Sequence, residues 1–205
     1  SLDRRQRQMC IRDSYYIGGK VELLTNGTGL TAVVFLPLIS ALILTAIPKS
    51  QELLIKGFAL VSSIVTFIIS ALLLPQFDFS NADKLQLGNK ISWIKSINAN
   101  YEIGIDGISL PLLILSTFIT VLAIIYSIEH LPEPKSPKGF LALILVLETG
   151  MNGTFVALDL ILFFVFFEIV LLPMYFMIGI WGDKTVRTVA AVSYTHLRAH
   201  ETDRY

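Results

Sequence analysis

The sequence predicts an all-α, polytopic membrane protein that crosses the bilayer five times. Of its 205 residues, 54% are hydrophobic and only 16% are charged, and the mean hydropathy is +0.67. A soluble domain of this size could hardly bury so much apolar surface. In addition, five apolar stretches are each long enough to cross a hydrocarbon core of about 30 Å, which takes about 20 helical residues.

Each predicted helix is bounded by residues that begin or end helices. Pro48 closes the first stretch and Pro75 the second, because proline cannot continue helical hydrogen bonding. Asp106 is a suitable N-cap for the third, and Asp159 marks a tight turn between the last two, which should therefore be antiparallel neighbours. The segment 129–137 contains three prolines and is predicted to be an exposed connector. The predicted helices cover residues 29–47, 57–74, 107–128, 139–157 and 160–181.

The two ends of the chain resemble translated sequencing adapter. Residues 4–13 (RRQRQMCIRD) match the translation of an adapter used in transposase-based sequencing libraries, and residues 192–197 (VSYTHL) match the translation of its reverse complement. We therefore expect segments 1–14 and 192–205 to be non-native, and residues 15–191 to be an N-terminal fragment of a longer membrane domain. Residues 15–191 contain no cysteine, so neither disulfides nor thiolate metal sites are expected there.

Loop charges predict which side of the membrane each connection faces. Six basic residues fall in the short connections on one side. The opposite side carries Lys20 and the long segment 77–106, in which lysines are diluted by acidic residues. Because basic loops are retained in the cytoplasm, the native N-terminal part is predicted to lie outside. The six basic residues are Lys49, Lys56, Lys135, Lys138, Lys184 and Arg187.

Glu168 is the strongest functional clue in the sequence. It lies in the fifth predicted helix, within the apolar run FFVFFEIVLLP at residues 163–173. A carboxylate at the centre of a membrane helix costs at least about 2.5–3.5 kcal/mol on insertion scales, so it normally faces a partner, a polar cavity or a proton path. Two interpretations stay open from the residues alone: a structural glutamate bonded to a neighbouring helix, and a residue that handles ions or protons.

A second acid, Glu148, lies in the fourth predicted helix. Glu148 and Glu168 are each about ten residues from the turn near Asp159, which places both about 15 Å from that surface and near the bilayer midplane. If the two carboxylates are close, repulsion and desolvation would favour proton binding by at least one of them. Alternatively, Glu148 points to a different neighbour and has a secondary polar or structural role.

Pro173 follows Glu168 by little more than one helical turn and deprives the Ile169 carbonyl of its usual donor. The resulting kink beside a buried acid can admit water or a neighbouring polar side chain. Further polar residues of the third and fourth predicted helices could line a polar path or bond between helices, which is their commoner use. They are Ser116, Thr120, Thr149 and Asn152.

Three segments together resemble the chain M (chain 4) family of proton-translocating NADH:quinone oxidoreductase, respiratory complex I. Residues 163–182 (FFVFFEIVLLPMYFMIGIWG) resemble the fifth-helix signature of that family. Residues 104–112 (GIDGISLPL) and 150–162 (GMNGTFVALDLIL) resemble the preceding segments in order and spacing. The resemblance covers most of residues 101–182, whereas residues 15–100 agree mainly in hydropathy.

This resemblance implies an antiporter-like bundle of about fourteen helices in the membrane arm of the complex, where it couples quinone reduction elsewhere to proton translocation. It also implies that Glu168 is the essential proton-relay glutamate, paired with a lysine on a seventh helix beyond this chain. The fragment alone is therefore not expected to be active. No cofactor is expected on this chain; NADH, flavin, iron–sulfur clusters and quinone are expected on the assembled complex.

The resemblance also sets the expected surroundings and leaves two alternatives open. The expected partners are other membrane-arm subunits, the lipid bilayer and protons, with no nucleic acid, and the expected location is the bacterial inner membrane. The D component of multisubunit Na+/H+ antiporters shares the architecture and the buried glutamate, although the stretches GIDGISLPL and FFEIVLLPMYF favour the complex I family. The chain could also be a membrane scaffold whose Glu148 and Glu168 only hold helices together.

Overall fold

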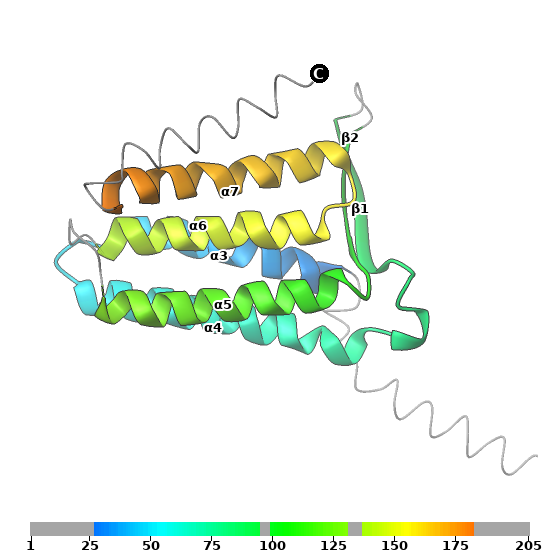
Figure 1. Ribbon diagram of the computed structural model, residues 1–205, viewed down its shortest axis with the longest axis horizontal. Coiled ribbons are helices and arrows are strands. Elements are labelled where there is room, and N and C mark those ends of the chain that lie inside the picture. The colour runs from blue at the N-terminus through cyan, green and yellow to red at the C-terminus, as the bar shows by residue number, and fades with distance from the viewer. Residues whose placement is uncertain (1–26, 95–98, 131–136, 183–205) are drawn as a thin grey trace, which may run out of the picture.

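Five long helices form a bundle in the computed structural model, and a β-hairpin runs across one end of it (Figure 1). The structure describes residues 27–94, 99–130 and 137–182. Within these residues, five helices are long and apolar enough to cross a membrane, which confirms the predicted spans and the helical fold class. The segments predicted to be non-native, 1–14 and 192–205, lie outside the described residues.

The helices lie close to their predicted positions. The largest difference is at the second helix, which begins five residues before Gly57, at Glu52. Lys56 interrupts the apolar run there but not the helix, since lysine is a good helix former. The fourth helix begins at Pro137, where a missing N–H costs nothing because the first helical amides have no intrahelical partner. The bounds are α3 (Thr28–Ala46), α4 (Glu52–Leu72), α5 (Ser109–Glu129), α6 (Pro137–Val156) and α7 (Leu160–Trp181).

The central helix of the bundle is α6, which packs against α3, α4, α5 and α7 and is the most enclosed of the five. In contrast, α7 lies at one edge, packs along α6, and is the least buried (Figure 1). At the end away from the hairpin, the Lys138 ammonium donates to the Ile47 carbonyl at 2.7 Å. This bond places a cation at the C-terminal end of α3, where the helix dipole favours positive charge.

Two glycines of α6 bring α6 and α7 into close contact. A Cβ atom on Gly150 would stand 2.8 Å from the backbone nitrogen of Val170, and a Cβ atom on Gly153 would overlap the ring of Phe166. A residue larger than glycine at position 150 would require the backbone of α7 to move, and one at position 153 would have to displace the Phe166 ring.

The segment between α4 and α5 contains an antiparallel hairpin that the sequence analysis did not predict. β1 (Gln86–Ile94) pairs with β2 (Ala99–Ile105), with Asn89 opposite Ile103. The register shifts on both sides of the pairing, and Leu87 adopts a left-handed backbone with φ 53°. Such bulges interrupt the alternation of apolar and polar residues by which a strand is recognised in a sequence.

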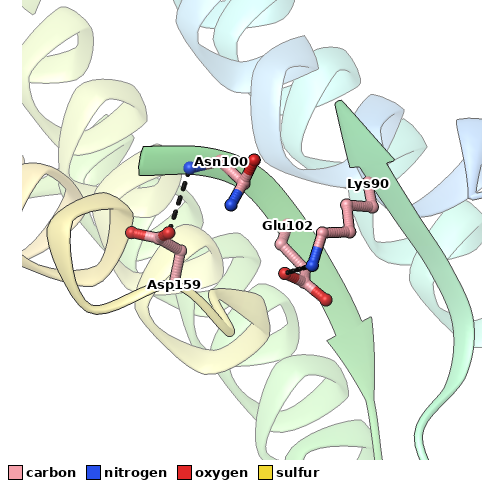
Figure 2. Close-up of polar contacts among 4 residues, drawn as sticks. All are labelled: Lys90, Asn100, Glu102 and Asp159. Carbon is pink, nitrogen blue, oxygen red and sulfur yellow. Dashed lines mark hydrogen bonds and ion pairs between the residues drawn. The ribbon is translucent and has the colours of Figure 1, made fainter. Parts of the chain in front are cut away.

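The hairpin is fixed to the turn between α6 and α7 (Figure 2). Ile103 of β2 is fully buried in the apolar core. The Leu158 amide donates to the Glu102 carbonyl at 2.9 Å, and the Asn100 amide donates to the Asp159 carboxylate at 3.0 Å. Asp159 also caps α7, as the turn predicted at this residue requires, by accepting from the amides of Ile161 and Leu162. The Lys90–Glu102 ion pair, at 2.7 Å, joins the two strands on their outer side.

α5 begins at Ser109, two residues later than predicted, with Ile108 and not Asp106 at the N-cap position, but the Asp106 side chain still binds the start of the helix. Its carboxylate accepts from the amides of Ile108 at 3.0 Å and Ser109 at 2.7 Å. The Ser109 hydroxyl in turn accepts from the Asp106 amide at 2.9 Å. The hydrogen bond from the Ser109 amide is the main cause that holds the pKa of Asp106 below its usual value. This carboxylate therefore has a complete structural explanation at the end of β2.

Replacing Asp159 with alanine is expected to loosen the hairpin from the α6–α7 turn. The change removes the acceptor for the Asn100 amide and the capping bonds of α7. These backbone hydrogen bonds hold the pKa of Asp159 below its usual 3.8, and the bond from the Asn100 amide has the largest effect. A carboxyl with a lowered pKa stabilises the fold above its unfolded-state pKa, and this contribution is lost as the pH falls through the folded-state value.

Hydrogen exchange at the Asn100 amide measures both effects. We expect Asp159→Ala to speed exchange at neutral pH, and the wild type to lose the same protection only below pH 3.8. Asp83→Ala, at an exposed position of the same connecting segment, is the control. Unchanged protection of Asn100 in the Asp159 variant would contradict this account of the hairpin.

Candidate functional site

Glu168 lies at mid-depth on α7, on the side turned away from α6. It follows the start of α7 at Leu160 by eight residues, or about 12 Å along the helix axis. Phe166 and Val170 mark the face of α7 that contacts the two glycines of α6. At 3.6 residues per turn, Glu168 lies about 180° around the helix from the middle of that face. Its side chain is partly exposed in the described bundle.

Glu148 lies at the same depth on α6 but faces the interior of the bundle. It precedes the end of α6 at Val156 by eight residues and is fully buried, with 0% exposure. Asn152, one turn along α6 and on nearly the same side, reaches Ser116 of α5 and the Val33 carbonyl of α3. Glu148 therefore points toward α3 and α5 and away from α7.

The two acids are thus separated by the α6–α7 interface. Their matched depth agrees with the sequence-based estimate, but the carboxylates project from opposite sides of the glycine contact. Neither carboxylate oxygen of Glu148 has a hydrogen-bond partner, so no hydrogen bond joins it to Glu168. Of the two arrangements that the sequence left open, the structure has the one in which Glu148 points to a different neighbour.

A buried polar layer crosses the middle of the bundle around Glu148. One apolar cluster lies on the hairpin side and contains Leu30 and Val156, and a second lies on the opposite side and contains Leu44 and Leu141. Between them, four helices contribute buried polar side chains, with Ser40 on α3. We call the members from the other three helices the polar layer: Ser62, Ser63, Thr66 and Ser70 of α4, Ser116, Thr117 and Thr120 of α5, and Glu148, Thr149 and Asn152 of α6.

Asn152 connects three helices at this layer. The Ser116 hydroxyl donates to the Asn152 side-chain oxygen at 3.2 Å, and the Asn152 amide group donates to the Val33 carbonyl at 3.3 Å. Pro37 lies four residues after Val33 and has no N–H, so the Val33 carbonyl lacks its helical donor. Asn152 therefore satisfies a carbonyl that a proline leaves without its usual partner, which membrane helices require in the absence of water.

The hydroxyl groups of α4 were missed by the sequence analysis. The Ser70 hydroxyl lies 2.9 Å from that of Thr117, which ties α4 to α5. Thr66 donates to the Ser62 carbonyl and Ser63 to the Leu60 carbonyl, both within α4. Their spacing in the sequence could have revealed this polar face. The four residues occupy positions i, i+1, i+4 and i+8, which share one side of a helix. Ser116 and Asn152, which the sequence suggested for a polar path or an interhelical bond, form such a bond.

Pro173 lies inside α7 on the side that packs on α6. It is buried, and α7 continues through it to Trp181. Its ring nitrogen cannot donate to the Ile169 carbonyl, which is next to Glu168 in the chain. Among the residues that the structure describes, no group of three or more histidine, cysteine or acidic side chains is placed to hold a metal ion. The two side chains at mid-depth that could bind and release a proton are Glu148 of α6 and Glu168 of α7.

Two family descriptions match most of the chain. "NADH-ubiquinone oxidoreductase chain 4, amino terminus" matches residues 32–154, and "NADH:quinone oxidoreductase/Mrp antiporter, TM" matches residues 157–200. The solved structure of an archaeal membrane-bound sulfane sulfur reductase, a respiratory membrane complex, contains a chain similar in fold, with a TM-score of 0.66 and 20% identity. That similarity covers 82% of this chain and 33% of the other.

Relatives of known name are similar in sequence over most of this chain. NADH-ubiquinone oxidoreductase chain 4 of Marchantia polymorpha is 36% identical, over 82% of this chain and 33% of its own length. NAD(P)H-quinone oxidoreductase chain 4 of Gloeobacter violaceus is 37% identical over 76% and 28%, respectively. NADH-quinone oxidoreductase subunit M of Rickettsia typhi is 36% identical over 80% and 34%. The chain therefore spans about a third of the length of the curated relatives it matches.

Replacing Asn152 with leucine is expected to destabilise the bundle. The change keeps the side-chain size. It removes the acceptor of the Ser116 hydroxyl and the donor to the Val33 carbonyl. Interhelical hydrogen bonds in membranes are worth about 0.6–1.7 kcal/mol each. Thermal or denaturant unfolding of the complete subunit in detergent measures the loss. The control is Thr154→Val, because Thr154 donates only to the Met151 carbonyl of its own helix.

Pro37→Ala tests the proposed reason for the Asn152 bond. Alanine restores an N–H that can donate to the Val33 carbonyl, so we expect Asn152→Leu to cost less in the Pro37→Ala background than in the wild type. Additive effects of the two substitutions in a double-mutant cycle would contradict the pairing of Pro37 with Asn152.

Proposed function

Because the chain belongs to the NADH-ubiquinone oxidoreductase chain 4 family, we propose that the complete subunit is part of the membrane arm of a proton-translocating NADH:quinone oxidoreductase. In this proposal, the subunit couples quinone reduction elsewhere in the complex to proton movement, and Glu168 is its proton-relay residue. The observation that carries the proposal is the placement of one acid at mid-depth on α7, on the side away from α6.

Three features of α7 support a relay at Glu168. The acid sits in an otherwise apolar helix, where an ionisable group is too costly to keep without a use. It faces away from α6, so its carboxylate is turned to the side on which further helices of the complete subunit can pack. The Ile169 carbonyl, deprived of its donor by Pro173, adds a second acceptor beside it. Together they form a site suited to a proton donor or a cationic side chain from another helix.

The relay step that this arrangement supports is a simple proton exchange. The Glu168 carboxylate accepts one proton from a donor on one side and becomes a neutral carboxylic acid. It then releases that proton to an acceptor on the other side and regains its charge. The resemblance noted above implies that a lysine of a later helix alternates with it, since an adjacent ammonium favours the ionised carboxylate.

The remaining features of the proposal concern surroundings. The expected partners are further membrane-arm subunits of the complex, lipid and protons. NADH, flavin, iron–sulfur clusters and quinone belong to other parts of the assembled enzyme. We place the subunit in the bacterial inner membrane, with the hairpin and the start of α3 outside, because the basic residues Lys49, Lys56 and Lys138 lie at the opposite end of the bundle.

The closest alternative is a component of a multisubunit Na+/H+ antiporter. The description that matches residues 157–200 names both kinds of complex, so this part of the chain does not separate them. The description that matches residues 32–154 names chain 4 alone and supports the complex I assignment. Purification of the assembled complex would distinguish the two, because redox subunits accompany one and antiporter subunits the other.

Replacing Glu168 with glutamine is expected to abolish proton pumping by the assembled complex. Glutamine keeps the size and polarity of the side chain but cannot bind or release a proton at neutral pH. Since a positioned proton-transfer group typically contributes 100-fold or more, we expect NADH-driven pumping in membrane vesicles to fall by roughly a factor of 100 or more. NADH oxidation with an artificial electron acceptor should persist.

The matched control is Glu52→Gln, the same substitution at an exposed position in the first turn of α4. Normal pumping by an assembled Glu168→Gln enzyme would refute the relay. Failure of that variant to assemble, with Glu52→Gln assembling normally, would favour the scaffold role instead.

A further inference from the structure

Glu148 is a buried acid that the proposed relay does not use. Its side chain has 0% exposure, and both carboxylate oxygens lack a hydrogen-bond partner. It faces the polar layer, on the opposite side of α6 from Glu168. A carboxyl group in this situation requires an explanation, because most buried polar groups in proteins are hydrogen-bonded.

No described cation lies at the level of Glu148. The helix α3 has no ionisable side chain. On α4 and α5, which also pack on α6, the ionisable side chains lie near the helix ends, and those of the hairpin that contact α6 lie on β2. Two ionisable side chains of α7, Glu168 and Tyr175, lie on the far side of the α6–α7 interface. Lys138 of α6 itself lies ten residues away, or about 15 Å, and donates to the Ile47 carbonyl. The side chains near helix ends are Glu52 and Lys56 of α4 and Tyr126 and Glu129 of α5, and those on β2 are Tyr101 and Glu102.

The protonation state of Glu148 follows from this environment. An ionised carboxylate without a cation or a hydrogen-bond donor in an apolar bundle costs several kcal/mol. A neutral carboxylic acid avoids the charge and needs only an acceptor for its own O–H group. Burial without a partner therefore favours the form that carries a proton.

The polar layer supplies acceptors for that O–H group. The Ser116–Asn152 bond fixes the antiparallel register of α5 and α6. One turn farther from the hairpin, Thr120 of α5 therefore lies level with Glu148 of α6. The Thr120 hydroxyl donates to the Ser116 carbonyl, which leaves its oxygen lone pairs available. On α4, Ser62 is buried in the same layer, and its hydroxyl oxygen also lacks a partner.

We propose that Glu148, with the buried hydroxyls of α4 and α5 in the polar layer, is a proton-binding site separate from Glu168. Its ligand is a single proton, because a proton needs one acceptor whereas a metal cation needs several oxygen ligands arranged around it. The carboxylate takes one proton to become a neutral carboxylic acid and releases the same proton when it regains its charge. This site does not depend on the relay proposed for Glu168.

Infrared spectroscopy of the assembled complex tests the proposal directly. A protonated carboxyl group has a C=O stretching band that a carboxylate lacks. We expect the wild type at neutral pH to show such a band that exchanges slowly in D₂O, and Glu148→Gln to lose it. Glu168→Gln and Glu52→Gln should both retain it, which separates this site from the relay and from exposed acids.

Stability provides the second measurement, in case the spectra are crowded. Glutamine resembles the protonated acid, so Glu148→Gln should assemble with a Tm close to that of the wild type at neutral pH. From neutral to alkaline pH the wild type should lose more thermal stability than Glu148→Gln, because a group that binds its proton more tightly in the folded state makes stability fall as pH rises.

Three results would overturn the proposal. The first is an unchanged carboxylic-acid band in Glu148→Gln together with an unchanged pH dependence of Tm. The second is loss of that band when Na+ is added to the wild type, which would indicate a metal cation as the ligand. The third is failure of Glu148→Gln to assemble while Glu52→Gln assembles normally, which would indicate that the ionised form is needed for the fold.

Discussion

The close contact between α6 and α7 is the constraint on which the arrangement of the acids depends. Gly150 and Gly153 allow the backbone of α7 to lie against α6, so Val170 and Phe166 occupy the space that larger side chains would need. This contact fixes which side of each helix faces the other. As a consequence, Glu148 is turned into the bundle and Glu168 is turned out of it, although both stand at the same depth.

The polar layer shows how the bundle keeps proline and polar groups within an apolar span. Pro37 leaves the Val33 carbonyl without its helical donor, and Asn152 supplies that donor from α6. Ser116 then completes the bonds of Asn152. Because these groups satisfy one another, the layer is stable without a charge. Glu148 and Ser62 differ from the other members of the layer because their side-chain oxygens have no hydrogen-bond partner, and the buried acid without a partner is what points to a proton as its ligand.

Hydropathy and helix-breaking residues were enough to predict the five spans, and the last one matched the structure at both ends, 160–181. The depths of Glu148 and Glu168 also followed from their distance to the turn at Asp159. The side that each acid faces did not, because helical phase has no reference until the contacting face is known. The hairpin was missed for a related reason: β2 is defined by its docking on the α6–α7 turn, and bulges hide the alternation of β1.

The separation of the two acids is tested most directly by cysteine cross-linking in the complete subunit within its complex. Gly153→Cys/Phe166→Cys places two thiols across the close contact, where a Cβ atom at Gly153 meets the Phe166 side chain, and is expected to form a disulfide with a membrane-permeant oxidant. Glu148→Cys/Glu168→Cys is expected to remain reduced, because its side chains leave opposite sides of that contact. A disulfide between positions 148 and 168 would contradict the account.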